Sequence, residues 1–340
     1  MLNFIRKSIP LLLIIVLSTI LSGCGSTSKT AASDKGNSKG SSQTLKVVSF
    51  LPTDHQFTVD MVPRWMEKIE EGTNGELTFE WIGGPESMSA DEQFKAVQRG
   101  IIDIGFLSTA EYLDTIPESR AMYLNSQSPT EMRESGFFDY FADKYKEHDV
   151  EFLGRWISGS YYFWSNDKLK SLEDLKGAKY RSNPIYHPVQ TGLGMTPITI
   201  SPGDVYTALE RGMVDGFAFP ILGPRDNGWT EVTEYIIDEP FLNIGSSIVM
   251  NAKMLDSLSA ETKERVIQLT EEFENEMITY FEEKEKEEMK LIKNAGVESI
   301  KLNKKDSEKF QQVVHDSTWK VIKEKVSSED FTKLQSFLED

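Results

Sequence analysis

The first third of the chain alternates short apolar runs with longer segments whose apolar residues recur every three or four positions. Apolar residues dominate 45–50 (LKVVSF), 77–82 (LTFEWI) alternates apolar with polar residues, and 101–106 is again a short apolar run. These three segments predict strands. Between them, 57–71 and 90–99 have the spacing of amphipathic helices. The strand–helix order predicts a parallel sheet covered by helices.

A second run of the same kind begins near Val150 with the sequence VEFLGRWI. It continues through a strand that includes 178–181, a helix over 202–211 and a strand over 214–219. The globular part of the chain, about 300 residues, is long enough for two lobes with separate cores. The pattern therefore predicts an α/β protein of two lobes.

The segment 261–293 predicts one unusually long helix, with Ser259 as its N-cap and Gly296 as its stop. At 1.5 Å per residue it would be roughly 50 Å long, which is more than one lobe needs. We therefore expect it to lie across both lobes. The run 282–288 (EEKEKEE) within it is entirely charged and indicates a solvated helix face. Apolar residues at helical spacing mark its buried side: Val266, Leu269, Phe273, Met277, Tyr280 and Phe281.

The N-terminus has the order of features typical of a secretion signal. Arg6 and Lys7 precede an apolar core over 11–21, and small residues lead to Cys24, the only cysteine in the chain. The apolar run is shorter than the roughly 20 residues of a spanning helix. The arrangement over 1–23 resembles a bacterial lipobox, which implies lipidation of Cys24. A plain signal peptide, or an uncleaved anchor with an incidental cysteine, is the alternative.

The residues after Cys24 are rich in Ser, Gly, Thr and Lys, and 24–43 is predicted to be a flexible tether. The formal net charge is -17 at pH 7. The signal's only charged residues, Arg6 and Lys7, are basic, so their removal makes the chain more negative still. An acidic chain of this kind argues against nucleic acid as a partner and against docking onto anionic lipid by charge. Membrane association is therefore expected only through the lipid anchor.

The chain lacks the common motifs of metal and cofactor chemistry. It contains no HExxH, CxxC, GxSxG or Walker sequence, and 192–194 lacks the third glycine of a dinucleotide-binding loop. These absences predict no metal site, no cofactor and no enzyme, although 54 acidic residues do not strictly exclude a two-carboxylate hydrolase. The four histidines are scattered along the chain: His55, His148, His187 and His315.

Residues 172–220 carry the most specific pattern in the chain. DLKGAKYR at 174–181 is followed by GMTP at 194–197, DVYTAL at 204–209 and GMVDG at 212–216. This series resembles the solute-binding proteins of TRAP transporters, the DctP family. Segment 93–108 and the approach to the long helix resemble that family too, so the similarity covers residues 45–335.

The resemblance implies a two-lobe fold like that of periplasmic binding proteins, with a long interlobe helix. One lobe would comprise 44–158 and about 245–285, and the other 159–244 and about 286–335. The implied function is an extracytoplasmic receptor, anchored to the cell membrane by lipidated Cys24. It would capture a small organic acid by hinge closure. It would act as a monomer and deliver the acid to the membrane permease subunits of a TRAP symporter.

In the family, an arginine at the position of Arg181 meets the ligand carboxylate, and a planar guanidinium suits two carboxylate oxygens. This chain has Tyr161 and Phe219 where the family often has a second arginine and an asparagine. These departures predict a single arginine and aromatic walls, favouring a monocarboxylate with an apolar or aromatic body over a sugar acid. Further candidates for the cleft are Trp81, Glu86 and Trp164. The alternative is an internal ion pair for Arg181, and ordinary packing or surface positions for the others.

Other functions stay open at this point. A small amine could be held in an aromatic cage with an acid nearby. The same fold could feed a sensor rather than a transporter, or carry an exported enzyme, because fold alone does not determine function.

Overall fold

The computed structural model describes residues 42–339. The predicted signal peptide, the predicted lipidation of Cys24 and nearly all of the predicted tether lie outside the described residues. Within 42–339, no helix is long and apolar enough to cross a membrane.

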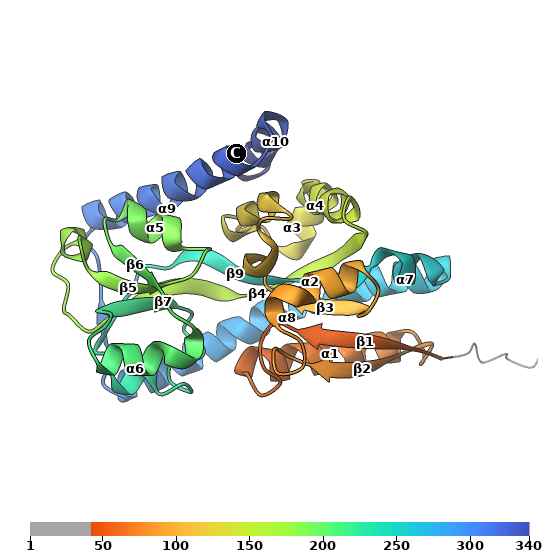
Figure 1. Cartoon of the computed structure of the whole chain (residues 1–340), viewed down its shortest axis with the longest axis horizontal. Coiled ribbons are helices and arrows are strands. Elements are labelled where there is room, and N and C mark those ends of the chain that lie inside the picture. Colours follow the sequence, from red (N-terminus) through yellow and green to blue (C-terminus); the bar gives the residue numbers. More distant parts are fainter. Residues whose placement is uncertain (1–41, 340) are drawn as a thin grey trace, which may run out of the picture. The chain divides into compact units, whose positions relative to one another are not determined.

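The first lobe is built on a sheet with the strand order β2-β1-β3-β9-β4 (Figure 1). β1 (Gln43–Ser49), β2 (Leu77–Gly83) and β3 (Ile104–Leu107) are parallel, as the sequence predicted. β9 (Phe241–Asn251) runs antiparallel to both of its neighbours, β3 and β4 (Val150–Ser165). The third strand begins later than predicted because 101–103 form a bend after the preceding helix.

Helices cover both faces of this sheet. α1 (Gln56–Gly72) packs on the face that carries Val47, and α2 (Ala90–Gln98) packs on the face that carries Val48. Two short helices join α2 on its face: α3 (Pro129–Glu134) and α4 (Phe137–Lys146). The core is therefore split by the sheet into two layers.

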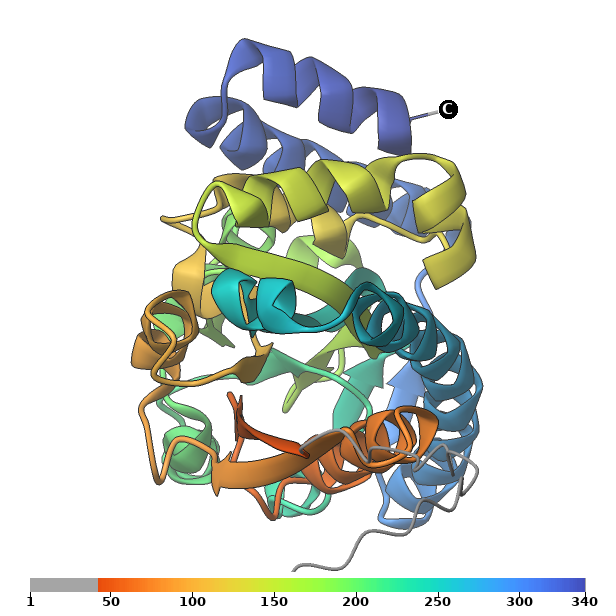
Figure 2. The ribbon, with the colours of Figure 1, turned by 90° about the vertical axis from the view of Figure 1, so that its right-hand side faces the viewer.

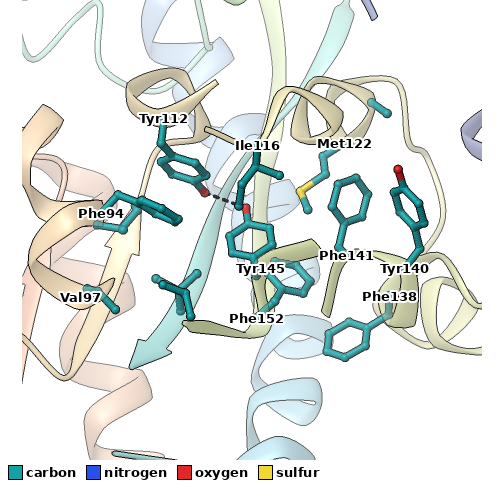
Figure 3. Packing of buried hydrophobic residues seen from close by; sticks show 14 of the residues in the cluster. Phe94, Val97, Tyr112, Ile116, Met122, Phe138, Tyr140, Phe141, Tyr145 and Phe152 are labelled. Carbon is teal, nitrogen blue, oxygen red and sulfur yellow. Dashed lines mark hydrogen bonds between the residues drawn. The ribbon is translucent and has the colours of Figure 1, made fainter. Parts of the chain in front are cut away.

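Aromatic side chains fill the layer under α2 and α4 (Figure 3). The ring of Phe94 stacks on Tyr112 with 4.4 Å between ring centroids. The hydroxyls of Tyr112 and Tyr145 are 2.8 Å apart, and both are hydrogen-bonded to Ser247 Oγ, at 3.0 and 2.9 Å. Two 3-10 helices close this layer: η1 (Thr109–Tyr112) and η2 (Pro117–Tyr123).

The second lobe is built on the strand order β4-β7-β5-β6. β5 (Lys179–Ser182), β6 (Thr196–Thr199) and β7 (Gly216–Phe219) provide two parallel pairs, and β7 is antiparallel to β4. The connecting helices follow the strand–helix alternation that the sequence predicted. These helices are α5 (His187–Gly192) and α6 (Val205–Glu210). A further parallel pair, β8 (Tyr235–Ile237) and β10 (Glu298–Ile300), lies beside β4, with β8 hydrogen-bonded to it.

β4 pairs in both sheets, and β9, which pairs with β3 and β4, extends from Phe241 in the second-lobe core to Met250 in the first-lobe core. Both strands therefore cross from one lobe to the other. Their pairing shifts register between Ile157 and Tyr161. Gly159 has φ +100 there, and a Cβ at this position would collide with Glu285 Oε1. Burial raises the pKa of Glu285 to about 7. A side chain at this point of the crossing strand would be strained because of the positive φ, and it would also force the Glu285 carboxyl group to move.

α8 (Ala260–Asn294) confirms the predicted long helix and its N-cap, Ser259, whose side chain accepts a hydrogen bond from Thr262 N. It packs on β4 and α1 and runs past both lobes (Figure 1). The apolar side chains of α8 between Val266 and Phe281 are buried in the core of the first lobe, and Ile292 is buried in the core of the second lobe. The charged run 282–288 is not uniformly solvated, because Glu288 is buried and paired with Arg225, with Arg225 Nε 2.7 Å from Glu288 Oε1.

The C-terminal helices return to the first lobe. α9 (Lys304–Lys325) starts in the second lobe, where Phe310 and Val314 are buried. Trp319 and Ile322 at its far end, and Leu334 of α10 (Ser328–Leu338), pack instead in the first-lobe cluster. Figure 2 shows these helices lying over α4. This differs from the predicted assignment of 286–335 to the second lobe, because the apolar face of α9 is long enough to serve both cores. The remaining α-helix of the described range, α7 (Ala252–Ser257), follows β9, and three further 3-10 helices lie in the second lobe: η3 (Leu172–Leu175), η4 (Pro202–Asp204) and η5 (Trp229–Glu231).

Candidate functional site

The carboxyl ends of the parallel strands in the two lobes are brought together by contacts across the crossing strands. Leu222, which follows β7, is buried in the first-lobe cluster with Phe57 and Phe281. Arg120 of η2 donates from Nη1 to the carbonyl oxygens of Pro184 (3.1 Å) and Ile185 (3.0 Å), which follow β5. Ligand sites of open α/β sheets lie at such strand ends.

Arg181 lies near the end of β5 and is 5% exposed. Its Nε donates to Ile200 O at 3.0 Å, and its Nη1 donates to the hydroxyl of Tyr186. Tyr186 in turn donates to Ala218 O at 3.0 Å. Within the described range, no Asp or Glu side chain forms an ion pair with Arg181. The guanidinium is thus held in place by neutral acceptors, and its positive charge has no direct counter-ion.

Tyr161 lies on β4 beside this arginine and is 8% exposed. Its ring meets that of Tyr186 edge to face at 5.0 Å, so Tyr161 and Arg181 share a neighbour. Burial raises the pKa of Tyr161 well above its ordinary value, although the charge of Arg181 and a hydrogen bond with Asn183 oppose this. The structure therefore brings together two of the residues predicted for the cleft, with Tyr161 as a neutral phenol.

Tyr123 of η2 is buried in one cluster with Tyr161 and Tyr186, and we call these three tyrosines the row of hydroxyls. Its hydroxyl is hydrogen-bonded to Thr109 Oγ1, just after β3. Burial raises the pKa of Tyr123 to about 12, although Arg155 and Arg120 oppose the rise. Neutral hydroxyl groups thus extend from the end of β3 to the end of β5.

Phe219 and Trp164 pack in one second-lobe cluster, separate from the cluster that holds Tyr161, and differ in how far they are buried. Phe219 is the last residue of β7, half-buried, with its ring edge to face with Trp229 at 4.8 Å. Trp164 is completely buried, stacks on Phe217 at 5.5 Å and donates from Nε1 to Phe219 O at 3.0 Å. The structure thus places Trp164 in the second-lobe core, with its polar atom satisfied, rather than at an accessible wall.

Trp81 and Glu86 lie at the end of β2. Trp81 is half-buried, and its buried Nε1 has no hydrogen-bond partner within residues 42–339. Glu86 is exposed and accepts a hydrogen bond from Gly84 N at 2.7 Å. Backbone N–H groups, first that of Gly84, lower the pKa of Glu86. Trp81 therefore retains a free donor, whereas the carboxylate of Glu86 is engaged with its own loop.

Two further arginines are buried near the row of hydroxyls and were missed from the sequence. Arg155, on β4, is 1% exposed, and Arg120 is 9% exposed. Neither forms an ion pair with a described carboxylate. For Arg155 a signal existed, because an arginine inside the apolar run VEFLGRWI has to be buried with its strand. For Arg120, in the polar segment PESRAM, the sequence offers no such signal.

This arrangement is suited to binding an anion. It provides guanidinium and hydroxyl donors beside aromatic faces in a region from which water is largely excluded, where charge-assisted hydrogen bonds are strong. Among residues 42–339, no group of three or more His, Cys, Asp or Glu side chains could hold a metal ion.

The chain is similar to known proteins over most of its length. The family model described as "Bacterial extracellular solute-binding protein, family 7" (DctP) matches residues 49–325. The ectoine-binding periplasmic protein TeaA of Halomonas elongata is 24% identical over 235 residues, which are 66% of this chain and 69% of TeaA.

Solved structures share the fold at low sequence identity. A TRAP periplasmic solute-binding protein from Desulfovibrio salexigens with bound orotic acid superposes with a TM-score of 0.76 at 19% identity, covering 87% of this chain and 97% of that one. One from Sulfitobacter sp. with bound β-D-galacturonate superposes with a TM-score of 0.73 at 21% identity, covering 88% and 100%. The predicted two-lobe α/β fold is confirmed.

Proposed function

Because the chain belongs to family 7 of the bacterial extracellular solute-binding proteins, the DctP family of TRAP receptors, we propose that it binds a small organic acid whose carboxylate is held by Arg181. Proteins of this family are extracytoplasmic substrate-binding receptors and not enzymes. The observation that carries the proposal is the buried guanidinium of Arg181 without an acidic partner. A buried guanidinium without an acidic partner is unfavourable, and a solute carboxylate would supply the missing anion.

The surroundings of Arg181 favour an acid with an apolar or aromatic body. Tyr161, whose ring packs on Tyr186 next to Arg181, and Phe219, which packs on Trp229 at the end of β7, are the rings proposed to stand where a sugar acid would need hydrogen-bonding groups. A sugar hydroxyl buried against a ring loses its water without gaining a partner, at about 1–3 kcal/mol for each unsatisfied group. Trp81 and Glu86 are the candidates from the first lobe, and Trp164 is left out because it belongs to the core.

A thermal-shift screen of aromatic and aliphatic monocarboxylates against sugar acids tests this preference. We expect monocarboxylates with apolar bodies to raise the melting temperature, since a ligand that binds only the folded state stabilises it. Galacturonate, which the Sulfitobacter protein binds, should give a smaller shift at the same concentration. If only sugar acids stabilise the protein, the preference is wrong. Native mass spectrometry of the freshly purified protein would identify any acid that co-purifies.

Capture is proposed to occur by closure of the two lobes about β4, β9 and α8. A residue as buried as Arg181 can receive solute only if the lobes separate, and the crossing strands carry the irregular pairing near Gly159 that such a hinge needs. The solute then shifts the equilibrium toward the closed form by its greater affinity for that form. The closed receptor, acting as a monomer, would deliver the acid to the membrane subunits of a TRAP symporter.

Anchoring through a lipid on Cys24 is the remaining part of the proposal, and Cys24→Ala tests it. The variant should lose membrane association, because the sulfur that carries the lipid is absent. Its folded domain should be unchanged, since Cys24 precedes the described lobes. Detergent phase partitioning compares the two proteins, with circular dichroism as the control for folding. A variant that still enters the detergent phase like the wild type would show that the anchor lies elsewhere.

A further inference from the structure

Arg155 is a buried cation that the proposed role of Arg181 leaves unexplained. Its side chain, 1% exposed, donates from Nη1 to Met122 O at 2.8 Å. Its Nε is buried without a hydrogen-bond partner in the described part of the chain. Desolvation of a charged group without full compensation is strongly unfavourable, and unpaired buried donors add to the cost. An acceptor supplied by a bound solute would offset this cost.

The charges around Arg155 do not neutralise it. Glu274 of α8 accepts a hydrogen bond from the backbone N of Arg155 at 2.6 Å, but its other oxygen is bound to Arg133 Nη2 at 2.6 Å. The remaining neighbours that act on Arg155 are Tyr123 and Tyr145, and burial raises the pKa of both phenols, so they are neutral. Glu274 is therefore paired with the guanidinium of Arg133, and its hydrogen bond with Arg155 involves the backbone N–H and not the guanidinium. Burial accordingly lowers the pKa of Arg155 to about 10.

The position of Arg155 connects it with the proposed site. It lies six residues before Tyr161 on the same crossing strand, β4, opposite Ser247 of β9. Arg155 Nη1 donates to the carbonyl oxygen of Met122, the residue before Tyr123. Tyr123 is buried in one cluster with Tyr161 and with Tyr186, whose hydroxyl accepts a hydrogen bond from Arg181. The order Arg155, Tyr123, Tyr161, Arg181 thus runs from the first lobe to the second, with a cation at each end.

We propose that Arg155 is a second solute-binding residue, which receives an oxygen acceptor at the end of the solute opposite to the carboxylate held by Arg181. The solute would then be a carboxylic acid with an apolar or aromatic body and a second acceptor, either a carbonyl oxygen or a second carboxylate. This inference rests on the proposed function. A solute with two acceptors would contact both lobes at once. It would therefore bind the closed form more tightly than the open form and shift the equilibrium toward closure.

The test uses matched acids that differ only in the second acceptor. Valerate is compared with levulinate and glutarate, and benzoate with isophthalate, by calorimetry on the wild-type protein. Within at least one set, the acceptor-bearing acid should bind ten-fold or more tightly than the plain acid. In Arg155→Met this advantage should fall to within about two-fold, while the affinity for the plain acid is retained. Arg155→Lys keeps the charge but loses the planar fork, so it should fold and lose much of the advantage.

Arg133→Met is the matched control. Arg133 lies on α3, and its ion-pair partners, Glu271 and Glu274, belong to α8 and not to the row of hydroxyls. The Arg133→Met variant should have a lower melting temperature than the wild type, with the same ratio of affinities for the acceptor-bearing and the plain acid. The inference would be overturned if Arg155→Met lost affinity equally for both acids of a set, or if no acceptor-bearing acid bound the wild type more tightly than its plain counterpart. Either result would leave the role of Arg181 intact. Failure of all five acids to bind the wild type at millimolar concentration would overturn the proposed function for this class of acid, and this inference with it.

Discussion

Arg181→Ala is expected to weaken binding of the cognate acid by roughly two to three orders of magnitude. Arg181 has no ion-pair partner among the described residues, so removing it leaves a solute carboxylate desolvated and without its guanidinium. Breaking a buried charge pair from one side typically costs about 3–5 kcal/mol. Each 1.4 kcal/mol corresponds to about a factor of ten in affinity. Calorimetry with the acid identified by mass spectrometry measures the difference.

Arg181→Lys is the informative companion variant. It preserves the charge but cannot present two parallel N–H donors, and it also loses the hydrogen bond from Nε to Ile200 O. We expect it to recover little of the lost affinity. An affinity of Arg181→Ala within a few-fold of the wild type would place this arginine outside the site. That result would favour an amine as the solute and make the acidic residues near the aromatic walls the next positions to change.

Trp164→Ala is expected to destabilise the protein by about 3–5 kcal/mol, the usual cost of truncating a large buried aromatic residue. The indole is completely buried, stacks on Phe217 and holds Phe219 O through its N–H. The loss should appear as a lower midpoint in denaturant unfolding, with the affinity for the solute nearly unchanged under conditions where the variant is folded.

Trp81→Ala is the matched control for that variant. Trp81 is only half-buried and its Nε1 has no partner among residues 42–339, so less packing is lost. It should be the less destabilised of the two variants, and it should lose affinity if Trp81 lines the cleft. A Trp164→Ala protein with wild-type stability and impaired binding would return Trp164 to the site and remove it from the core.

The helices and strands could be predicted because each carries its own periodic pattern. β1, β2 and the long helix α8 have apolar spacings that local geometry alone explains, and the cap at Ser259 marks where α8 begins. The family pattern over 172–220 also located Arg181, since strand, turn and helix signals are short-range. The boundaries of the strands differed from the prediction where a bend precedes a strand, as it does before β3.

The destination of a side chain was harder to predict. Tyr161 and Trp164 stand three residues apart on one strand, so their side chains point to opposite faces of the sheet. Only the tertiary structure shows that one face packs against Tyr186 beside Arg181 and the other against Phe217 in a separate core. α9 likewise has one apolar face in sequence, but only tertiary packing divides it between two cores.

The sequence by itself determined the family, the two-lobe α/β fold, the spine helix and the arginine proposed to meet the carboxylate, because these depend on periodicity and on contiguous motifs. Only the tertiary structure decided which charges lack partners. Arg155 and Glu274 are 119 residues apart, and whether a buried guanidinium is neutralised depends on contacts between such distant segments. The uncompensated cations at the two ends of the row of hydroxyls arise from this long-range assembly, which no local pattern records.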